Sequence, residues 1–83
     1  MSLQRGSAVT VTRAARLYRL SRSTLLYYDR IGLLTPSARS QAGYRLYDEA
    51  DLARLGAICR YRAVGIPLAG VPALLRGGTG DSA

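Results

Sequence analysis

The chain has 83 residues, enough for one small domain with a modest hydrophobic core. Its twelve basic residues, all arginine, outnumber five acidic ones, and the net charge of +7 indicates an anionic partner, of which nucleic acid is the commonest. Arginine suits phosphate and guanine recognition, but a GC-rich genome would explain its use over lysine equally well. The chain has no histidine and a single cysteine, so an internal disulfide is excluded and neither a zinc site nor an enzyme active site is expected.

The two ends of the chain differ in composition from the middle. Residues 1–8 are small and polar and are expected to form a disordered arm, and the glycine-rich residues 77–83 a flexible tail. Residues 9–76 are therefore predicted to form a single folded domain. The apolar runs are too short to span a bilayer and no export signal is visible, which favours a cytoplasmic protein without a membrane partner. No cofactor is expected.

Two short helices are predicted near the start of the domain, over residues 12–18 and 22–30. Ser21 is a good N-cap for the second helix. Only residues 19–21 separate the two helices, and this spacing is typical of a helix-turn-helix. Thr10 or Thr12 is the candidate N-cap of the first helix. Gly32 is the expected C-terminal stop of the second helix.

A β-hairpin is predicted after the second helix. Its strands are expected near residues 33–35 and 44–46, joined by a loop of about six to eight residues. An isolated hairpin is not stable in water, so it must pack against the helices. A hairpin attached to a helix-turn-helix in this way is a wing.

The third helix is the clearest element, because Asp48 is a strong N-cap and Gly65 an expected stop. Its acidic start could form a carboxylate cluster, but capping of the helix is the favoured interpretation. Cys59 lies on the apolar stripe of this helix and is expected to pack in the core rather than to act as a redox or metal sensor. A fourth helix is predicted over residues 67–76, and Pro72 fits it only within the first turn.

Residues 21–28 are the candidate functional segment. A helix N-terminus attracts phosphate, and short polar side chains in a first turn can reach base edges in DNA. Simple capping and solubility explain the same residues equally well. Tyr27 and Tyr28 lie about 100° apart on a helix, so one can pack inward while the other points outward, although two half-buried aromatic side chains fit the spacing as well.

The following motifs resemble the signature of the MerR family of transcription regulators. Residues 25–34 contain Leu-Leu-Tyr-Tyr-Asp-Arg-Ile-Gly-Leu-Leu, close to the family pattern Leu-Arg-Tyr-Tyr-Glu-x-Ile-Gly-Leu-Leu. Pro36 and Arg39 match a Pro-x-x-Arg wing, and residues 43–47 contain Gly-Tyr-Arg-Leu-Tyr before an acidic helix start. Residues 64–68 resemble the second wing of the family. The similarity covers about residues 10–75.

The resemblance implies a mainly α, winged helix-turn-helix domain of four short helices with a small β-hairpin wing. Such a domain binds double-stranded operator DNA in sequence-specific transcription regulation, as a homodimer in the full-length form, and acts on promoters used by RNA polymerase. The second predicted helix would be the recognition helix. The candidate DNA-binding residues, from that helix and from matching family positions, are Ser21, Arg22, Ser23, Thr24, Tyr27, Tyr28, Arg39, Tyr44, Arg45 and Arg62.

The chain departs from the family pattern at three positions. Leu26 and Ser23 occupy positions where arginine is common, and Arg19 replaces the glycine of the turn. Family members continue into a long coiled-coil helix and an effector domain, and no apolar heptad pattern is visible here. Two interpretations fit the chain: a DNA-binding domain of a longer regulator, or a small protein that keeps only this domain. The alternative function is a winged-helix protein-interaction or excisionase-like accessory module.

Overall fold

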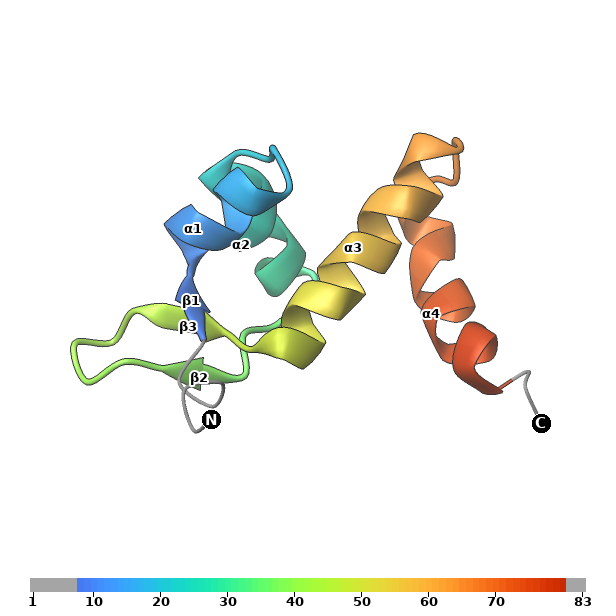
Figure 1. The fold of residues 1–83 in the computed structure, drawn as a ribbon. Coiled ribbons are helices and arrows are strands. Elements are labelled where there is room, and N and C mark those ends of the chain that lie inside the picture. Colours follow the sequence, from blue (N-terminus) through green and yellow to red (C-terminus); the bar gives the residue numbers. More distant parts are fainter. Residues whose placement is uncertain (1–7, 81–83) are drawn as a thin grey trace.

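The computed structural model describes residues 8–80, which form four α-helices and a small antiparallel sheet that lies beside the first three of them (Figure 1). The predicted architecture of four short helices with a hairpin wing is confirmed. The central strand of the sheet is β3, with β1 and β2 on either side. The elements in chain order are β1 Val9–Thr10, α1 Val11–Leu17, α2 Arg22–Arg30, β2 Ala38–Arg39, β3 Arg45–Tyr47, α3 Glu49–Ala63, the 3₁₀ turn η2 Leu68–Gly70 and α4 Val71–Gly80.

Local capping sets the limits of the first two helices. Thr10 caps α1, where its hydroxyl accepts a hydrogen bond from the Arg13 amide at 3.3 Å, so the helix begins one residue earlier than predicted. Ser21 caps α2 in the same way, through the Thr24 amide at 3.1 Å. These caps satisfy amides that the first helical turn would leave without partners. The predicted bounds of α2 are confirmed.

The turn between α1 and α2 contains a backbone conformation that arginine rarely adopts. The Leu20 amide donates to the Ala15 carbonyl at 2.9 Å, which closes the end of α1. This closure requires a left-handed residue between them, and Arg19 takes that conformation with φ 58°. Gly32 and Gly65 occupy the equivalent places after α2 and α3, with φ 76° and 94°. Arg19 therefore occupies the position of a turn glycine, in a backbone conformation that is sterically unfavourable for a residue with a side chain.

The hairpin differs from the prediction in its first strand. The expected strand at residues 33–35 is wrong, because the amides of Leu33 and Leu34 both donate to the Tyr28 carbonyl, at 2.8 and 3.2 Å, and complete the end of α2. Both side chains enter the core, at 3% and 1% exposed, whereas successive residues of a strand point to opposite faces.

The observed hairpin pairs Ala38 with Leu46 and Arg39 with Arg45 around a tighter loop, which projects from the helices (Figure 1). The Ser40 amide donates to the Tyr44 carbonyl at 2.8 Å. On its other edge, β3 pairs with β1, a two-residue strand that was not predicted.

The start of α3 links the sheet to the helices. Asp48 and Asp51 form a capping box, in which each carboxylate accepts from the other residue's amide, at 2.8 and 3.0 Å. Asp51 also accepts from the amide and hydroxyl of Ser37, at 2.9 and 2.7 Å. The hydrogen bond from the Asp51 amide is the main reason that the pKa of Asp48 is below its ordinary value. Capping explains these acids, as predicted.

The last helix begins and ends differently from the prediction. η2 follows Pro67, and α4 then begins at Val71, so Pro72 lies in the first turn of α4, where proline is tolerated. α4 extends to Gly80, beyond residue 76, where the domain was expected to end, although glycine is a poor helix former. The expected arm falls almost wholly outside the described residues, as do positions 81–83 of the expected tail.

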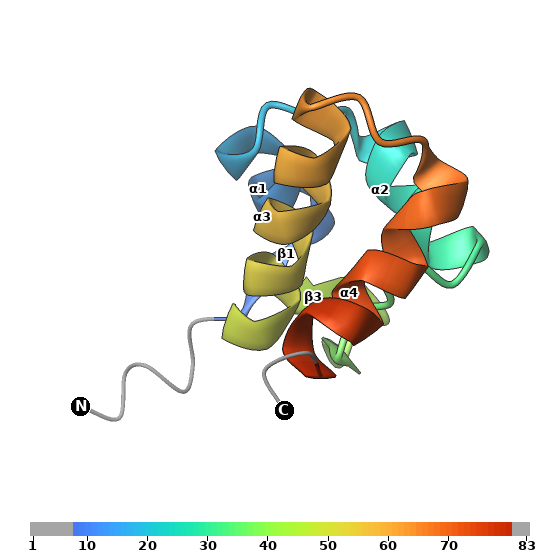
Figure 2. The same cartoon turned by 90° about the vertical axis from the view of Figure 1, so that its right-hand side faces the viewer.

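The core lies where α1, α2, α3 and the sheet meet, and α4 lies beside α3 (Figures 1 and 2). The predicted stripe of α3 is confirmed, with Leu55 and Ile58 fully buried and Cys59 partly buried against the core. The buried side chains are Ala14, Ala15, Leu25, Tyr28, Leu33, Leu34, Tyr47, Leu55, Ile58 and Val71. Burial of this apolar surface is the main favourable contribution to folding.

Replacing Arg19 with glycine is expected to raise the free energy of unfolding by about 1 kcal/mol. A left-handed backbone costs a non-glycine residue about 1–2 kcal/mol, and the greater freedom of glycine in the unfolded chain offsets part of the relief. Unfolding in urea, followed by circular dichroism, measures the change. Arg19→Ala is the control, because it removes the guanidinium and keeps the strained conformation. A glycine variant no more stable than the alanine variant would contradict the prediction.

Tyr47→Phe is also expected to stabilise the domain, by about 1 kcal/mol, because a buried hydroxyl without a partner costs stability. The Tyr47 side chain is 0% exposed and its hydroxyl has no hydrogen-bond partner among the described residues. Burial also raises the pKa of Tyr47, so the folded chain keeps a proton that the unfolded chain loses above pH about 10. The free energy of unfolding of the wild type therefore falls as the pH rises through that range, and that of the phenylalanine variant falls less.

The control is Tyr18→Phe, which removes a hydroxyl that donates to the Leu52 carbonyl at 3.0 Å. This variant should be less stable than the wild type by about 1 kcal/mol. Urea titrations of the three proteins at neutral and alkaline pH make the comparison. Destabilisation by Tyr47→Phe at neutral pH would show that the buried hydroxyl makes a favourable interaction.

Candidate nucleic-acid interface

The N-terminal half of α2 presents its polar side chains to solvent. Arg22 and Ser23 are exposed, and Thr24 is half-buried. The Ser21 hydroxyl is engaged in the cap and lies 2.9 Å from the Thr24 hydroxyl, so these two side chains fix each other. Leu25, which follows Thr24, is fully buried. The helix is thus held in the core while its first turn remains open to a ligand.

The two adjacent tyrosines of α2 take different places. Tyr27 is 44% exposed, whereas Tyr28 is 6% exposed and belongs to the core. Burial raises the pKa of Tyr28, and the nearby Arg62 guanidinium opposes that shift. Of the two arrangements that the sequence allowed, the structure therefore has the one in which Tyr28 packs inward and Tyr27 points outward.

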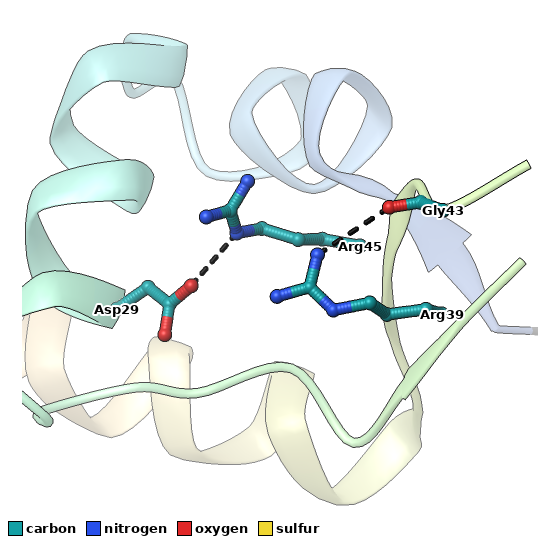
Figure 3. Close-up of polar contacts among 4 residues, drawn as sticks. All are labelled: Asp29, Arg39, Gly43 and Arg45. Carbon is teal, nitrogen blue, oxygen red and sulfur yellow. Dashed lines mark hydrogen bonds and ion pairs between the residues drawn. The ribbon is translucent and has the colours of Figure 1, made fainter.

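The wing brings a second set of arginines beside α2. Figure 3 shows that Asp29 of α2 points toward Arg45 of β3, with the Arg45 Nε 2.7 Å from the Asp29 Oδ2. Arg39 lies next to this pair, and its Nη1 donates to the Gly43 carbonyl across the hairpin at 3.4 Å. Tyr44 at the hairpin loop is 67% exposed. The wing therefore presents positive and hydrogen-bonding groups.

A hollow of about 310 Å³ lies between the wing and the starts of α1 and α2. Its lining residues include two arginines, two threonines and a tyrosine and no acidic residue, and basic residues without an acid favour an anion over a cation. The lining residues are Thr10, Val11, Thr12, Arg22, Tyr44 and Arg45.

A second hollow, of about 560 Å³, runs along the other side of α2 toward the turn after α3. Arg62 reaches it from the end of α3, where its Nη1 donates to the Ile66 carbonyl at 2.9 Å and stabilises the turn at residues 64–68. The lining residues are Leu20, Ser23, Thr24, Tyr27, Tyr28, Arg62 and Leu68. Arg62 thus lies beside the recognition-helix candidates although it is far from them in sequence.

The structure brings eight of the ten predicted site residues to these two hollows, and leaves out Ser21, which caps α2, and Arg39, which braces the hairpin. Sequence reasoning missed Thr10, Thr12 and Asp29. Asp29 follows the tyrosine pair where the MerR pattern has glutamate, and this acidic position was the available signal.

Three further features concern metal binding, thiol reactivity and membrane crossing in the described part of the chain. Within residues 8–80, no cluster of histidine, cysteine, aspartate and glutamate is arranged to hold a metal. Burial raises the pKa of the Cys59 thiol, which disfavours the reactive thiolate. None of the helices in that range combines the length and apolar character needed to cross a membrane.

Comparisons with known proteins identify relatives of both the sequence and the fold. The family described as MerR HTH family regulatory protein matches residues 9–78. The HTH-type transcriptional activator TipA of Streptomyces coelicolor is 60% identical over 52 residues, which are 63% of this chain and 21% of TipA. The chain therefore spans about a fifth of that relative's length.

Solved structures show the same fold. The N-terminal part of the Bacillus subtilis multidrug transporter activator, MtaN, aligns with a TM-score of 0.78 and 42% identity, over 81% of this chain and 63% of that one. HiNmlR, a MerR family regulator lacking the sensor domain and bound to promoter DNA, aligns with a TM-score of 0.74 and 26% identity, over 87% of this chain and 55% of that one. The chain belongs to the MerR family of helix-turn-helix regulatory proteins and has the fold of their winged helix-turn-helix DNA-binding domain.

Proposed function

We propose that this chain binds double-stranded operator DNA, with the first turn of α2 in the major groove and the wing on the flanking phosphates. The observation that carries the proposal is the hollow that joins Arg22 of the recognition helix to Tyr44 and Arg45 of the wing. Two arginines that line one hollow from separate elements, without an acid among its lining residues, favour contact with a phosphate backbone beside a groove.

The residues divide into two roles. Arg22, Ser23 and Thr24 are at the exposed N-terminal turn of α2, where side chains reach base edges, and an arginine there can donate two hydrogen bonds to guanine. The wing and the turn after α3 supply the phosphate contacts, which carry affinity without sequence information. The proposed phosphate-binding residues are Arg39, Tyr44 and Arg45 of the wing, Arg62 at the end of α3, and Tyr27 and Tyr28 of α2, which line the same hollow as Arg62.

We further propose that the chain regulates transcription in the cytoplasm, as one half of a homodimer in its full-length form and in contact with promoters used by RNA polymerase. TipA is named a transcriptional activator, and HiNmlR is bound to promoter DNA in its crystal structure. A single copy offers few phosphate contacts, so its binding should be weak and salt-sensitive. Two copies on an inverted repeat would gain affinity through their linkage.

Arg45→Ala is expected to weaken binding to every DNA sequence by about tenfold, because it removes a charged hydrogen-bond donor to phosphate. It should also lower the slope of log affinity against log salt by about one. The measurement is binding to a labelled pool of random duplexes at low and moderate salt, with sequencing of the bound fraction. Arg60→Ala, an exposed arginine on α3, is the control for lost charge. The absence of wild-type binding at either salt concentration would refute the proposed function.

Arg22→Ala is expected to change which sequences are enriched, since each bidentate contact to a base is worth about 1–3 kcal/mol of discrimination. The same selection experiment measures the change in the enriched motif. Arg30→Ala removes an exposed arginine from the opposite end of α2 and should lower affinity slightly with the motif intact. A uniform loss of affinity in Arg22→Ala, with no change in the motif, would show that Arg22 contacts phosphate and not a base.

A further inference from the structure

The ion pair between Asp29 and Arg45 joins the recognition helix to the wing. Asp29 is the second-last residue of α2, and Arg45 begins β3, sixteen residues later. The Arg45 side chain is 35% exposed and the Asp29 side chain 17%, so the pair is half-buried between the two elements. Figure 3 shows the carboxylate and the guanidinium facing each other across this junction.

The contact leaves most of the guanidinium available. The hydrogen bond to Asp29 uses Nε at 2.7 Å, and a guanidinium has four further N–H donors on its two Nη atoms. Arg45 also lines the hollow that contains Arg22 and Tyr44. A carboxylate that holds Nε therefore fixes the plane in which the remaining donors lie, at the edge of an anion-binding hollow.

From this geometry we infer that Asp29 is a positioning residue for DNA binding: it orders Arg45 before DNA arrives, so that Arg45 meets a backbone phosphate beside the groove that Arg22 enters. This inference rests on the proposed function. An arginine without such a partner would lose its rotational freedom only on binding, and that ordering would reduce affinity. The carboxylate thus strengthens binding to a polyanion although its own charge repels DNA.

The positioning role and simple electrostatics predict opposite changes in DNA affinity when the charge of Asp29 is removed. Asp29→Asn raises the net charge of the protein by one, and a polyanion should then bind more tightly if charge alone matters. Positioning predicts that Asp29→Asn binds roughly threefold to tenfold more weakly, which is the size expected for ordering one long side chain on binding. Asp29→Glu keeps a carboxylate and should bind within about twofold of the wild type, since side-chain reach is the only change.

The experiment measures binding of the full chain to sheared duplex DNA of mixed sequence at moderate salt, with thermal melting to establish that each variant is folded. Glu49→Gln is the control for charge, because it also removes one negative charge but lies exposed at the start of α3. Its affinity should equal or slightly exceed that of the wild type. In Arg45→Ala, the further change Asp29→Asn should cause no additional loss, because the carboxylate acts through Arg45.

Affinity of Asp29→Asn equal to or above that of the wild type would overturn the inference and would show that the carboxylate competes with DNA for Arg45. An additive loss in the double variant would also overturn it. A measurement independent of DNA is the NMR signal of the Arg45 Nε–H group, which should be ordered and protected in the free wild type; a mobile side chain there contradicts the inference. Failure of the wild type to bind DNA would refute the proposed function instead, so the two failures are distinguishable.

Discussion

Burial of Tyr47 fixes the orientation of the central strand, and the position of the wing arginine depends on it. Tyr47 is 0% exposed at the end of β3. Side chains alternate along a strand, so Arg45, two residues earlier, lies on the same face as Tyr47 and is directed toward α2 and Asp29. The next residue after Tyr47 is Asp48, which caps α3. One buried ring therefore sets the register of the sheet, the direction of the wing arginine and the start of the longest helix.

The acidic residues are placed where they disturb the positive surface least. Asp48, Glu49 and Asp51 gather at the N-terminus of α3, where the helix dipole and the capping amides stabilise them. Asp29 is paired with Arg45, and Asp81 lies outside the described residues. The hollows on either side of α2 therefore have arginine in their walls and no acid. Segregation of this kind turns a modest net charge into a directional field, which speeds and orients association with an anion.

Local chemistry made much of the fold predictable. The limits of α2 and α3 follow from Ser21, Asp48 and the glycines after each helix, because capping depends on a few neighbouring residues. The first hairpin strand was misassigned because two leucines that close a helix end resemble a short apolar strand. β1 was missed because it is only two residues long, too short for an alternating pattern to be recognised.

The candidate site was predictable residue by residue, but its assembly was not. Spacing alone could not separate the exposed Tyr27 from the buried Tyr28, since neighbouring positions on a helix differ only in which side meets the core. The contact of Asp29 with Arg45 and the position of Arg62 beside α2 depend on tertiary packing. A resemblance to a family indicates which positions bind DNA, whereas the hydrogen bonds that orient their side chains are seen only in the folded structure.

Stability alone does not account for the Asp29–Arg45 pair. Exposed ion pairs contribute about 0–1 kcal/mol, because the order imposed on a long side chain offsets most of the attraction, and the arginine of this pair is 35% exposed. The apolar contacts around Leu25 and Leu55, both fully buried, already hold α2 and α3 in place. The pair therefore adds little to folding, and its clearest effect is to reduce the freedom of Arg45 in the unbound protein. Order imposed before binding costs nothing further when a phosphate arrives, so a small domain with few contacts gains most from it.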